Sequence, residues 1–420
     1  MKLLVFAHTP PPHHGQSYMV KLMLDGFGGD QRQRPRAARG PGVHGLECYH
    51  VNARLSRTSE DIGSFRAGKL GLLLGYCFTA IWCRYRYGVR TMYYVPCEGH
   101  RAALIRDWIV MAVCRPFFPQ IILHWHAAGL GKWLERVALW HTRVLTYRLF
   151  RKAYVSVVLS ELGKADAEKF WPSKLAVVHN GIPDPCPNFA QEALPRRRAR
   201  LAARQKLVAG LPLTAEDRAA TGSAPETVSV LFMGLCTRDK GLFDALEGVR
   251  QSNAILASQH APVRLKLRVA GKFVTEEEQR AFDEAMQTSG ADTWLEYLGF
   301  VSGEDKRKAF LESDIFCFPT FYRAESFGLV VAEAMAYGLP VVATRWRSLP
   351  EVLPPGYVGL VAPQKPDEVA QALLAVLTAE TGPALRDYFL RHFTADRFLT
   401  NLAGSIQQSG TDLAKPQPQP

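Results

Sequence analysis

Apolar runs of strand length alternate with helical patterns along nearly the whole chain of 420 residues. This alternation is typical of parallel sheets whose faces are covered by helices. In the first half the expected strands are 2–7, 91–95, 120–124, 154–159 and 175–179. In the second half they are 228–233, 264–270, 294–297, 315–318 and 340–343. The sequence therefore predicts an α/β protein with two Rossmann-like, doubly wound parallel-sheet domains.

The chain is too long for one ordinary domain of ~100–200 residues, and prolines mark where it divides. They stand at positions 183, 185, 187, 195, 212 and 225, around a basic helical piece at 196–206. We therefore expect an N-terminal domain at 1–190, a linker or insertion at 191–225 and a second domain at 226–390. The last residues, Lys-Pro-Gln-Pro-Gln-Pro, are typical of a disordered tail, which we place at 406–420.

The eight cysteines form no CxxC pair and have no histidines at zinc-finger spacing, so we interpret them as reduced thiols. Residues 1–7 lack a small-residue cleavage site and indicate a first strand, not a signal peptide. The longest apolar stretches are 70–83, which is short of the ~20 residues that a membrane span needs, and 108–124, which Arg115 and Pro116 interrupt. We expect a cytoplasmic protein without a transmembrane helix.

The net charge of +12 is concentrated in the first half of the chain. Residues 1–190 carry 25 Lys and Arg against 12 Asp and Glu, whereas residues 191–420 carry 26 against 27. Such asymmetry indicates a polyanionic partner, either nucleic acid or an anionic membrane. The aromatic and basic residues form no recognised RNA-binding signature, so nucleic acid is not the expected partner.

Residues 132–152 are the candidate for that surface. At helical spacing they carry an apolar stripe of Trp133, Val137, Trp140, Val144 and Tyr147. The surrounding basic residues are Lys132, Arg136, Arg143, Arg148, Arg151 and Lys152. A basic helix with an aromatic stripe suits an anionic bilayer and predicts peripheral binding at the inner face of the cytoplasmic membrane. In the alternative reading, the stripe faces the domain core and the charges form a solvated face.

The most specific motif is Glu-Ser-Phe-Gly-Leu-Val-Val-Ala-Glu at 325–333, which continues as Ala-Met-Ala-Tyr-Gly-Leu-Pro-Val-Val-Ala to position 343. A helix is expected to begin near Gly328, where free backbone N–H groups and the helix dipole favour a phosphate. Glu333 would lie early in that helix, eight residues after Glu325, so the two carboxylates could bracket an extended ligand. Without other signals, both are also compatible with ordinary surface glutamates.

A second motif places a lysine beside a glycine turn. The expected strand 228–233 ends at Gly234, and Lys240 stands just before the next expected helix. From there an ammonium can reach a phosphate as a point charge. The pattern is not a Walker A loop, because Gly241 and Leu242 follow where that motif needs Ser or Thr. Taken alone, the lysine also fits a solvated surface position.

Three more strands end in turn glycines, within Val-His-Asn-Gly-Ile at 178–182, Val-Ala-Gly at 269–271 and Leu-Gly-Phe-Val at 298–301. The order of these pieces, together with the glutamate pair, resembles the retaining nucleotide-sugar glycosyltransferases of family 4 over nearly the whole chain. The resemblance implies the GT-B fold, in which an acceptor-side domain and a nucleotide-sugar domain face each other across a cleft. We further expect a C-terminal helix at 391–405 that returns to the N-terminal domain.

The resemblance implies roles for residues that match the family's motif. Glu333 would hold the ribose hydroxyls of the donor, and Glu325 would contact the transferred sugar. The segment 299–301, which ends at Val301, would lie beside the base. The diphosphate would be held by Lys240 and by the backbone N–H groups of Phe327, Gly328 and Leu329.

One position departs from the family. Many members have an arginine directly after the glycine that matches Gly234, and this chain has Leu235. Arg238 is the nearest basic residue and could replace that second diphosphate clamp from a different position. In the N-terminal domain, the segment 10–16 stands where the family has a glycine-rich loop facing the diphosphate and acceptor, and Gly15 is the match.

His124 and His126 flank Trp125 at a strand end, so the two histidines share one face and Trp125 takes the other. Two histidines could begin a metal site, but no third ligand stands out, and a histidine here could also be structural. The resemblance places a histidine near the transferred sugar, and His126 fits that position better than His124. Asp-x-Asp is absent from the chain, so neither a metal nor another cofactor is expected.

We therefore expect a metal-independent, retaining hexosyltransferase that moves a sugar from a nucleotide diphosphate sugar to a hydroxyl of a glycan or lipid-linked acceptor. Bacterial envelope or exopolysaccharide assembly is the setting that the resemblance implies. A nucleotide-sugar epimerase or phosphorylase with the same fold is one alternative. A catalytically silent sugar-nucleotide-binding or membrane-scaffold protein is another, because Leu235 stands in place of the arginine.

Overall fold

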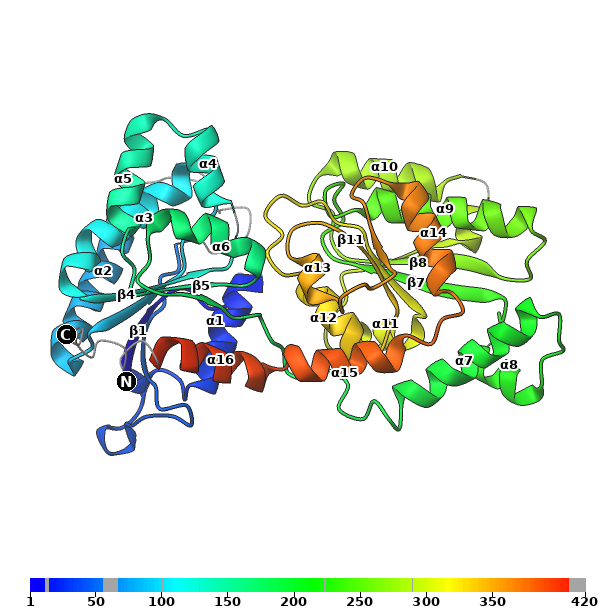
Figure 1. Ribbon diagram of the computed structural model, residues 1–420, viewed down its shortest axis with the longest axis horizontal. Coiled ribbons are helices and arrows are strands. Elements are labelled where there is room, and N and C mark those ends of the chain that lie inside the picture. The colour runs from blue at the N-terminus through cyan, green and yellow to red at the C-terminus, as the bar shows by residue number, and fades with distance from the viewer. Residues whose placement is uncertain are drawn as a thin grey trace, which may run out of the picture. The chain divides into compact units, whose positions relative to one another are not determined.

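The computed structural model describes residues 1–11, 15–55, 67–99, 101–127, 129–222, 224–288 and 290–407. The chain forms two compact units (Figure 1). Unit 1 comprises Met1–Gly181 and Ala395–Pro420, and unit 2 comprises Ile182–Thr394. The chain therefore enters unit 2 at residue 182, earlier than the expected end of the first domain at 190.

Unit 1 is built on a parallel sheet whose described strands follow the order β2-β1-β3-β4-β5-β6. They are β1 (Lys2–Phe6), β2 (Glu47–Val51), β3 (Thr91–Tyr94), β4 (Gln120–Trp125), β5 (Val155–Val158) and β6 (Leu175–Val177). The α-helices are α1 (Gly15–Gly26), α2 (Ala67–Tyr87), α3 (Arg101–Cys114), α4 (Leu130–Arg136), α5 (Trp140–Phe150), α6 (Glu161–Ala167) and α16 (Ala395–Gln407). Short 3₁₀ turns are η1 (Gln31–Gln33), η2 (Arg36–Ala38), η3 (Arg115–Phe117) and η4 (Glu168–Phe170).

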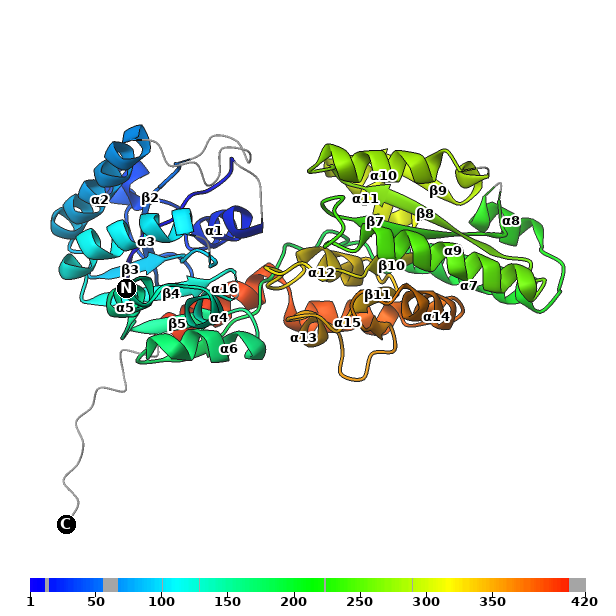
Figure 2. The same ribbon diagram turned by 90° about the horizontal axis from the view of Figure 1, so that it is seen from above.

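Helices cover both faces of this sheet, which explains why its strands are apolar on both sides. On one face, Leu4 and Phe6 of β1 belong to a core with Leu73 and Cys77 of α2 and with residues of α3 and α5. On the other face, α16 contacts α1 and β5 (Figure 2). The sheet is thus the middle of three layers.

Unit 2 repeats this architecture with the strand order β12-β11-β10-β7-β8-β9 over the described residues. The strands are β7 (Thr227–Met233), β8 (Arg264–Ala270), β9 (Leu295–Gly299), β10 (Ile315–Phe318), β11 (Val341–Thr344) and β12 (Leu360–Val361). The helices are α7 (Ala193–Val208), α8 (Ala215–Thr221), α9 (Leu242–Ser258), α10 (Glu276–Met286), η5 (Ala291–Thr293), α11 (Gly303–Glu312), α12 (Leu329–Ala336), α13 (Leu349–Val352), α14 (Pro366–Val376) and α15 (Gly382–His392). Helix α9 packs on α14, and α12 packs on α15.

The predicted fold class is confirmed: both units are doubly wound parallel sheets, and every expected strand is present with small shifts at its ends. Two strands, β2 and β12, were not predicted. The β2 sequence has no continuous apolar run, because Glu47 and His50 interrupt it. His50 is nevertheless buried, since its Nε2 atom hydrogen-bonds the Ala7 carbonyl at 2.8 Å. The two-residue β12 is too short for a periodic signal.

The segment expected as a linker or insertion, 191–225, contains the helices α7 and α8, and it belongs to unit 2. The arginines of α7 explain why this segment packs on the rest of unit 2. The Arg197 guanidinium donates to the carbonyls of Phe310, Ser313 and Tyr337, which stand at the C-terminal ends of α11 and α12. These carbonyls have no partner inside their helices, and a cation there also suits the helix dipole.

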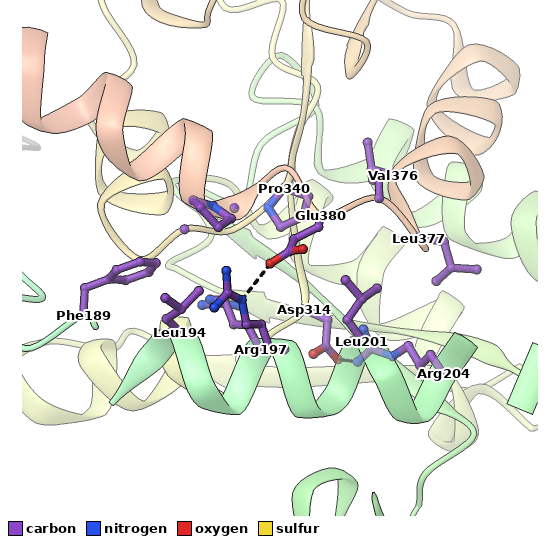
Figure 3. A pocket seen from close by; sticks show the side chains of 15 residues that line it. Phe189, Leu194, Arg197, Leu201, Arg204, Asp314, Pro340, Val376, Leu377 and Glu380 are labelled. Carbon is purple, nitrogen blue, oxygen red and sulfur yellow. Dashed lines mark hydrogen bonds and ion pairs between the residues drawn. The ribbon is translucent and has the colours of Figure 1, made fainter. Parts of the chain in front are cut away.

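Arg204 of α7 forms a buried ion pair with Asp314 (Figure 3). The same carboxylate accepts the backbone N–H of Ser229 at 2.9 Å. Burial alone raises the pKa of Asp314, but the charge and hydrogen bonds of Arg204 and the Ser229 N–H outweigh it and hold that pKa below its ordinary value. Beside the pair lies a pocket, partly open to solvent, between α7 and the segments around α14 and α15.

The C-terminal helix begins at Ala395 rather than at residue 391, because α15 continues to His392. It ends at Gln407, so residues 406 and 407, expected in the tail, are helical. The rest of the expected tail lies outside the described residues. Helix α16 belongs to unit 1, where it packs on α1 and β5.

Two further expectations bear on the surface and the core. Residues 132–152 do not form one helix: α4 ends at Arg136 and α5 begins at Trp140. All eight cysteines lie in the described part of the chain, and each is a free, buried thiol. None of the described helices combines the length and the apolar character that crossing a membrane requires.

Asp314→Asn is expected to lower the free energy of unfolding by about 3 kcal/mol near neutral pH, because Arg204 would keep a buried charge without its counter-ion. The wild-type contribution is complete above the ordinary carboxyl pKa and disappears as the pH falls through the lowered pKa of Asp314. The difference between the two proteins should therefore shrink in acid. Urea unfolding over a pH series measures it, with the exposed Asp292→Asn as control; equal stabilities at neutral pH would contradict the prediction.

Candidate active site

The candidate site of unit 2 lies where the strand order of its sheet reverses. Successive connections from β7 run outward through β8 to β9, whereas β10 returns to the other side of β7. In open parallel sheets, ligands bind at the carboxyl ends of the strands at such a switch point. Here that edge carries the loop after β7, which contains Lys240, and the loop after β10, which contains Glu325.

Lys240 and Glu325 form an ion pair, with 2.8 Å between Nζ and Oε2. Their side chains are only 16% and 9% exposed, so the pair is largely shielded from water. The ammonium also lies over the ring of Tyr322, 4.2 Å from its centroid, where a cation–π attraction holds it. The structure thus joins two residues that the sequence separates by 85 positions.

Backbone hydrogen bonds fix the two loops to each other. The Asp239 carbonyl accepts the Phe321 N–H at 2.7 Å and the Thr320 hydroxyl at 3.2 Å. Gly241, with φ of +83°, lies so close to the neighbouring loop that a Cβ atom there would be 2.2 Å from the Pro319 carbonyl oxygen. Only glycine combines this left-handed conformation with this approach.

The N-terminus of α12 begins directly after these loops. Gly328, its N-cap, has φ of +76° and ψ of +59°, and Leu329 is the first helical residue. The preceding Phe327 is buried with its ring 5.5 Å from that of Phe393, which anchors the helix start. The first turn of a helix presents N–H groups without intrahelical acceptors, and its dipole favours an anion.

Glu333, four residues into α12, pairs with a different lysine: its Oε1 lies 2.5 Å from Nζ of Lys306 on α11. Sequence reasoning missed Lys306, which lies in a helix that also carries three acidic and two other basic residues. Nothing in its local pattern distinguishes it from a solvated lysine. The pairing follows from the packing of α11 and α12 on the sheet of unit 2.

The remaining residues predicted for the site of unit 2 lie in the segments that follow β7 and β9. Gly234 ends β7 and donates its N–H to the Ala270 carbonyl at 3.0 Å. The guanidinium of Arg238 stacks on Phe243, with 4.6 Å to the ring centroid, and Leu235 is half exposed. Val301, half-buried, follows β9.

Sequence reasoning also missed a cation next to this segment. The Lys272 ammonium lies 4.7 Å from the ring centroid of the exposed Phe300, so it stands between the ends of β8 and β9. The structure therefore adds a lysine near the carboxyl edge that no motif indicated.

The two predicted residues of the N-terminal domain lie in unit 1. Gly15 is the exposed first residue of α1, directly after positions 12–14, which lie outside the described residues. His126 follows β4, and its ring lies 4.1 Å from that of His124, as the alternation of side chains predicted. Burial lowers the pKa of His124, and its Nδ1 is 2.6 Å from the Tyr93 hydroxyl. Among the described residues, no group of three or more His, Cys, Asp or Glu is arranged to hold a metal ion.

Residues 214–389 match the family model "Glycosyl transferases group 1". The candidate site of unit 2 lies within this domain. The matched segment is less than half of the chain, and it contains Lys240, Glu325, Lys306 and Glu333.

Curated relatives match over shorter stretches. O-antigen chain mannosyltransferase B of Escherichia coli is 42% identical over 85 residues, which are 20% of this chain and 21% of the relative. An uncharacterized glycosyltransferase of Methanocaldococcus jannaschii is 30% identical over 162 residues, 38% of each chain. The phosphatidyl-myo-inositol mannosyltransferase of Mycobacterium tuberculosis H37Rv is 40% identical over 81 residues, 19% of this chain and 21% of the relative. The matches thus span about a fifth to two fifths of these relatives.

Solved structures match over nearly the whole chain. Anabaena HepE, crystallised in complex with UDP, is 15% identical with a TM-score of 0.63, over 97% of this chain and 100% of that chain. Sucrose-phosphate synthase of Thermosynechococcus elongatus is 18% identical with a TM-score of 0.64, over 97% and 99%. At these identities the likeness shows the fold, and that fold is GT-B.

Gly241→Ala is expected to lower the free energy of unfolding by at least about 2 kcal/mol more than Gly290→Ala. Both glycines have positive φ, but an added Cβ meets nothing within 4 Å at Gly290 and a backbone carbonyl at Gly241. The difference between the two variants therefore isolates the collision between loops from the cost of the left-handed conformation. Urea unfolding of both variants measures it, and equal losses would show that the loops can separate freely.

Proposed function

We propose that the protein is a nucleotide-sugar-dependent, retaining glycosyltransferase that transfers a hexose to a hydroxyl of a glycan or lipid-linked acceptor. The observation that carries this proposal is the Lys240–Glu325 pair beside the N-terminus of α12, at the switch point of a glycosyl transferases group 1 domain. A cation, a carboxylate and a helix N-terminus at one point suit a diphosphate that is linked to a polyhydroxylated sugar.

The leaving group of such a donor is a nucleoside diphosphate, so the site must stabilise negative charge that develops on it. The Lys240 ammonium would supply positive charge without a metal ion. The backbone N–H groups of Phe327, Gly328 and Leu329, at the start of α12, would add to it. In the structure this ammonium is held by Glu325. Donor binding therefore requires an exchange: the diphosphate takes Lys240, and Glu325 becomes available to accept hydroxyl hydrogens of the sugar.

Glu333 would bind the ribose. A carboxylate can accept two hydroxyl hydrogens at once, as the adjacent 2′ and 3′ hydroxyls of a ribose offer them. Lys306 holds the Glu333 carboxylate in the free site, at 2.5 Å, and orients it. Val301 lies in the segment that would face the base, and Gly234 and Arg238 belong to the loop that would face the diphosphate.

In unit 1, we assign His126 to the transferred sugar and Gly15 to the diphosphate and acceptor. The ring of His126 packs against the ring of His124, which is buried and held in place by its hydrogen bond to Tyr93. Retention would follow from attack of the acceptor on the same face that the diphosphate leaves, with the departing phosphate oxygen receiving the acceptor proton.

The names of the relatives guide the choice of donor and setting. Two of the relatives described above are mannosyltransferases, and one of these acts on O-antigen chains. An uncharacterized 41.2 kDa protein in the cps region of Klebsiella pneumoniae is 43% identical over 65 residues. We therefore propose that the protein acts in the cytoplasm in envelope or exopolysaccharide assembly. GDP-mannose is the first donor to test, and UDP-glucose is the second.

A catalytically silent nucleotide-sugar-binding protein is the second candidate function. Leu235, half exposed at the end of β7, supports it, because the family's arginine is missing there and Arg238 stacks on Phe243. An epimerase or phosphorylase on the same fold would act on the donor without any acceptor hydroxyl.

Lys240→Met is expected to weaken nucleoside diphosphate binding at least about tenfold, because a charge-assisted contact to phosphate is lost. Calorimetric titration with GDP and UDP, with and without EDTA, measures it. Lys266→Met removes a lysine of β8 that pairs with Glu296 at 3.1 Å and serves as control. Unchanged affinity in Lys240→Met, or binding that EDTA abolishes in the wild type, would overturn the metal-free diphosphate site.

Glu325→Gln is expected to lower the transfer rate at least about a hundredfold and to leave nucleotide affinity equal or higher, because Lys240 loses its competing carboxylate. Glu296→Gln, which removes a carboxylate from β9, is the control. Sugar release or transfer from GDP-mannose and UDP-glucose measures turnover, and NMR of the product anomer reports retention. A wild type that binds nucleotide and turns over no donor would favour the silent protein.

A further inference from the structure

The outer surface of one helical layer in unit 1 is unusually apolar and basic. Helices α2, α3 and α5 lie side by side on one face of the sheet (Figures 1 and 2). The Trp108 indole of α3 donates to the Thr146 hydroxyl of α5 at 2.9 Å, and the Arg84 guanidinium of α2 donates to the Phe117 carbonyl after α3 at 2.9 Å. The three helices therefore form one continuous layer.

Helix α2 is apolar on its outward side as well as on its inward side. Its inward residues Leu73, Cys77, Ala80 and Cys83 are buried in the core of unit 1. On the opposite side, Phe78 is 65% exposed, Trp82 52% and Tyr85 71%, at helical spacing. The 21-residue helix contains no Asp or Glu. Nothing in unit 1 covers this aromatic stripe among the described residues.

The break between α4 and α5 adds a second apolar patch to the same layer. Trp133, the first residue of the expected stripe, is buried, so that part of the stripe faces the core. Tyr147 of that stripe also packs against the core of unit 1. The other members face outward, as does Leu139: Trp140 is 74% exposed, and Val137, Leu139 and Val144 are each more than half exposed. Two tryptophans, Trp82 and Trp140, thus stand on the outer surface of one layer.

The charges around these patches are almost all positive. Residues 67–152 carry thirteen Lys and Arg against three Asp and Glu. Of the three acids, Asp107 is fully buried beside Arg106, and Glu135 pairs with Lys169. Most of the chain's net charge of +12 therefore comes from the stretch 67–152, which contains the three helices of this layer.

We propose that this layer is a docking surface for an anionic lipid bilayer, with Phe78, Trp82, Tyr85 and Trp140 in the headgroup region and the surrounding arginines on lipid phosphates. Tryptophan and tyrosine side chains suit the boundary between headgroups and acyl chains, and Lys and Arg suit an anionic leaflet. A second copy of the chain is a poor occupant, because two such basic faces repel each other. The proposal concerns unit 1 and stands independently of the catalytic roles in unit 2.

Sedimentation of the full-length protein with vesicles tests the proposal. We expect at least about tenfold tighter binding to phosphatidylcholine vesicles that contain about 30% phosphatidylglycerol than to phosphatidylcholine alone, and weaker binding as salt rises. The double variant Trp82→Gln/Trp140→Gln should lose at least about tenfold of that binding, and Arg143→Gln/Arg148→Gln should lose its dependence on phosphatidylglycerol in large part. All four side chains are exposed or partly exposed, so replacing them leaves the core of unit 1 intact.

Matched controls come from unit 2. Leu211→Gln/Val358→Gln changes two exposed apolar residues, and Arg264→Gln/Arg280→Gln changes two exposed arginines. Both should bind vesicles as the wild type does. Equal vesicle binding by all variants, or no preference for phosphatidylglycerol, would overturn the proposal. So would binding of a mixed-sequence RNA in place of vesicles, or self-association through this face in sedimentation velocity. Nucleotide titration of the same variants reports separately on unit 2.

Discussion

Parallel strands deliver the loops that follow them to one edge of the sheet, and this constraint positions the whole candidate site of unit 2. At the switch point, the loops after β7 and β10 have no strand between them, so they contact each other directly. The Asp239 carbonyl ties them together, and Gly241 permits the approach. Lys240, Glu325 and the start of α12 converge because of this edge and not because of their positions in the sequence.

Four ion pairs of unit 2 differ in where they lie. The pair of Arg204 and Asp314 is buried and links α7 to the residue before β10. The pair of Arg386 and Asp184 is mostly buried and links α15 to the first residues of unit 2. Removing one partner of such a pair leaves a charge that water cannot reach, so these pairs persist. Lys240–Glu325 and Lys306–Glu333 belong to the candidate site. The function proposed above requires that Lys240 exchange Glu325 for the diphosphate of the donor.

The sequence predicted the strands because apolar runs and turn glycines are local patterns. The candidate site residues rest on a local pattern too, the contiguous motif at 325–333, and their roles stay predictions. The sequence could not predict β2, whose buried His50 depends on a carbonyl 43 positions away. Lys306 carried no local signal either, since its partner lies on another helix. The prolines around 191–225 predicted a linker or insertion. The packing of this segment on unit 2 could not be predicted, because Arg197 binds carbonyls that only the folded unit brings near.

Helix α2 shows the limit of hydropathy as a guide to burial. A helix that is apolar all round ordinarily lies in a core or a membrane. Helix α2 does neither completely, because the sheet takes the side of Leu73 and Cys77 and leaves Phe78, Trp82 and Tyr85 in water. Since the neighbouring helices present arginines and not a covering layer, the outward side suits the apolar and anionic environment that we propose for it. The interface of a bilayer offers the two together, which neither bulk water nor an ordinary protein core does.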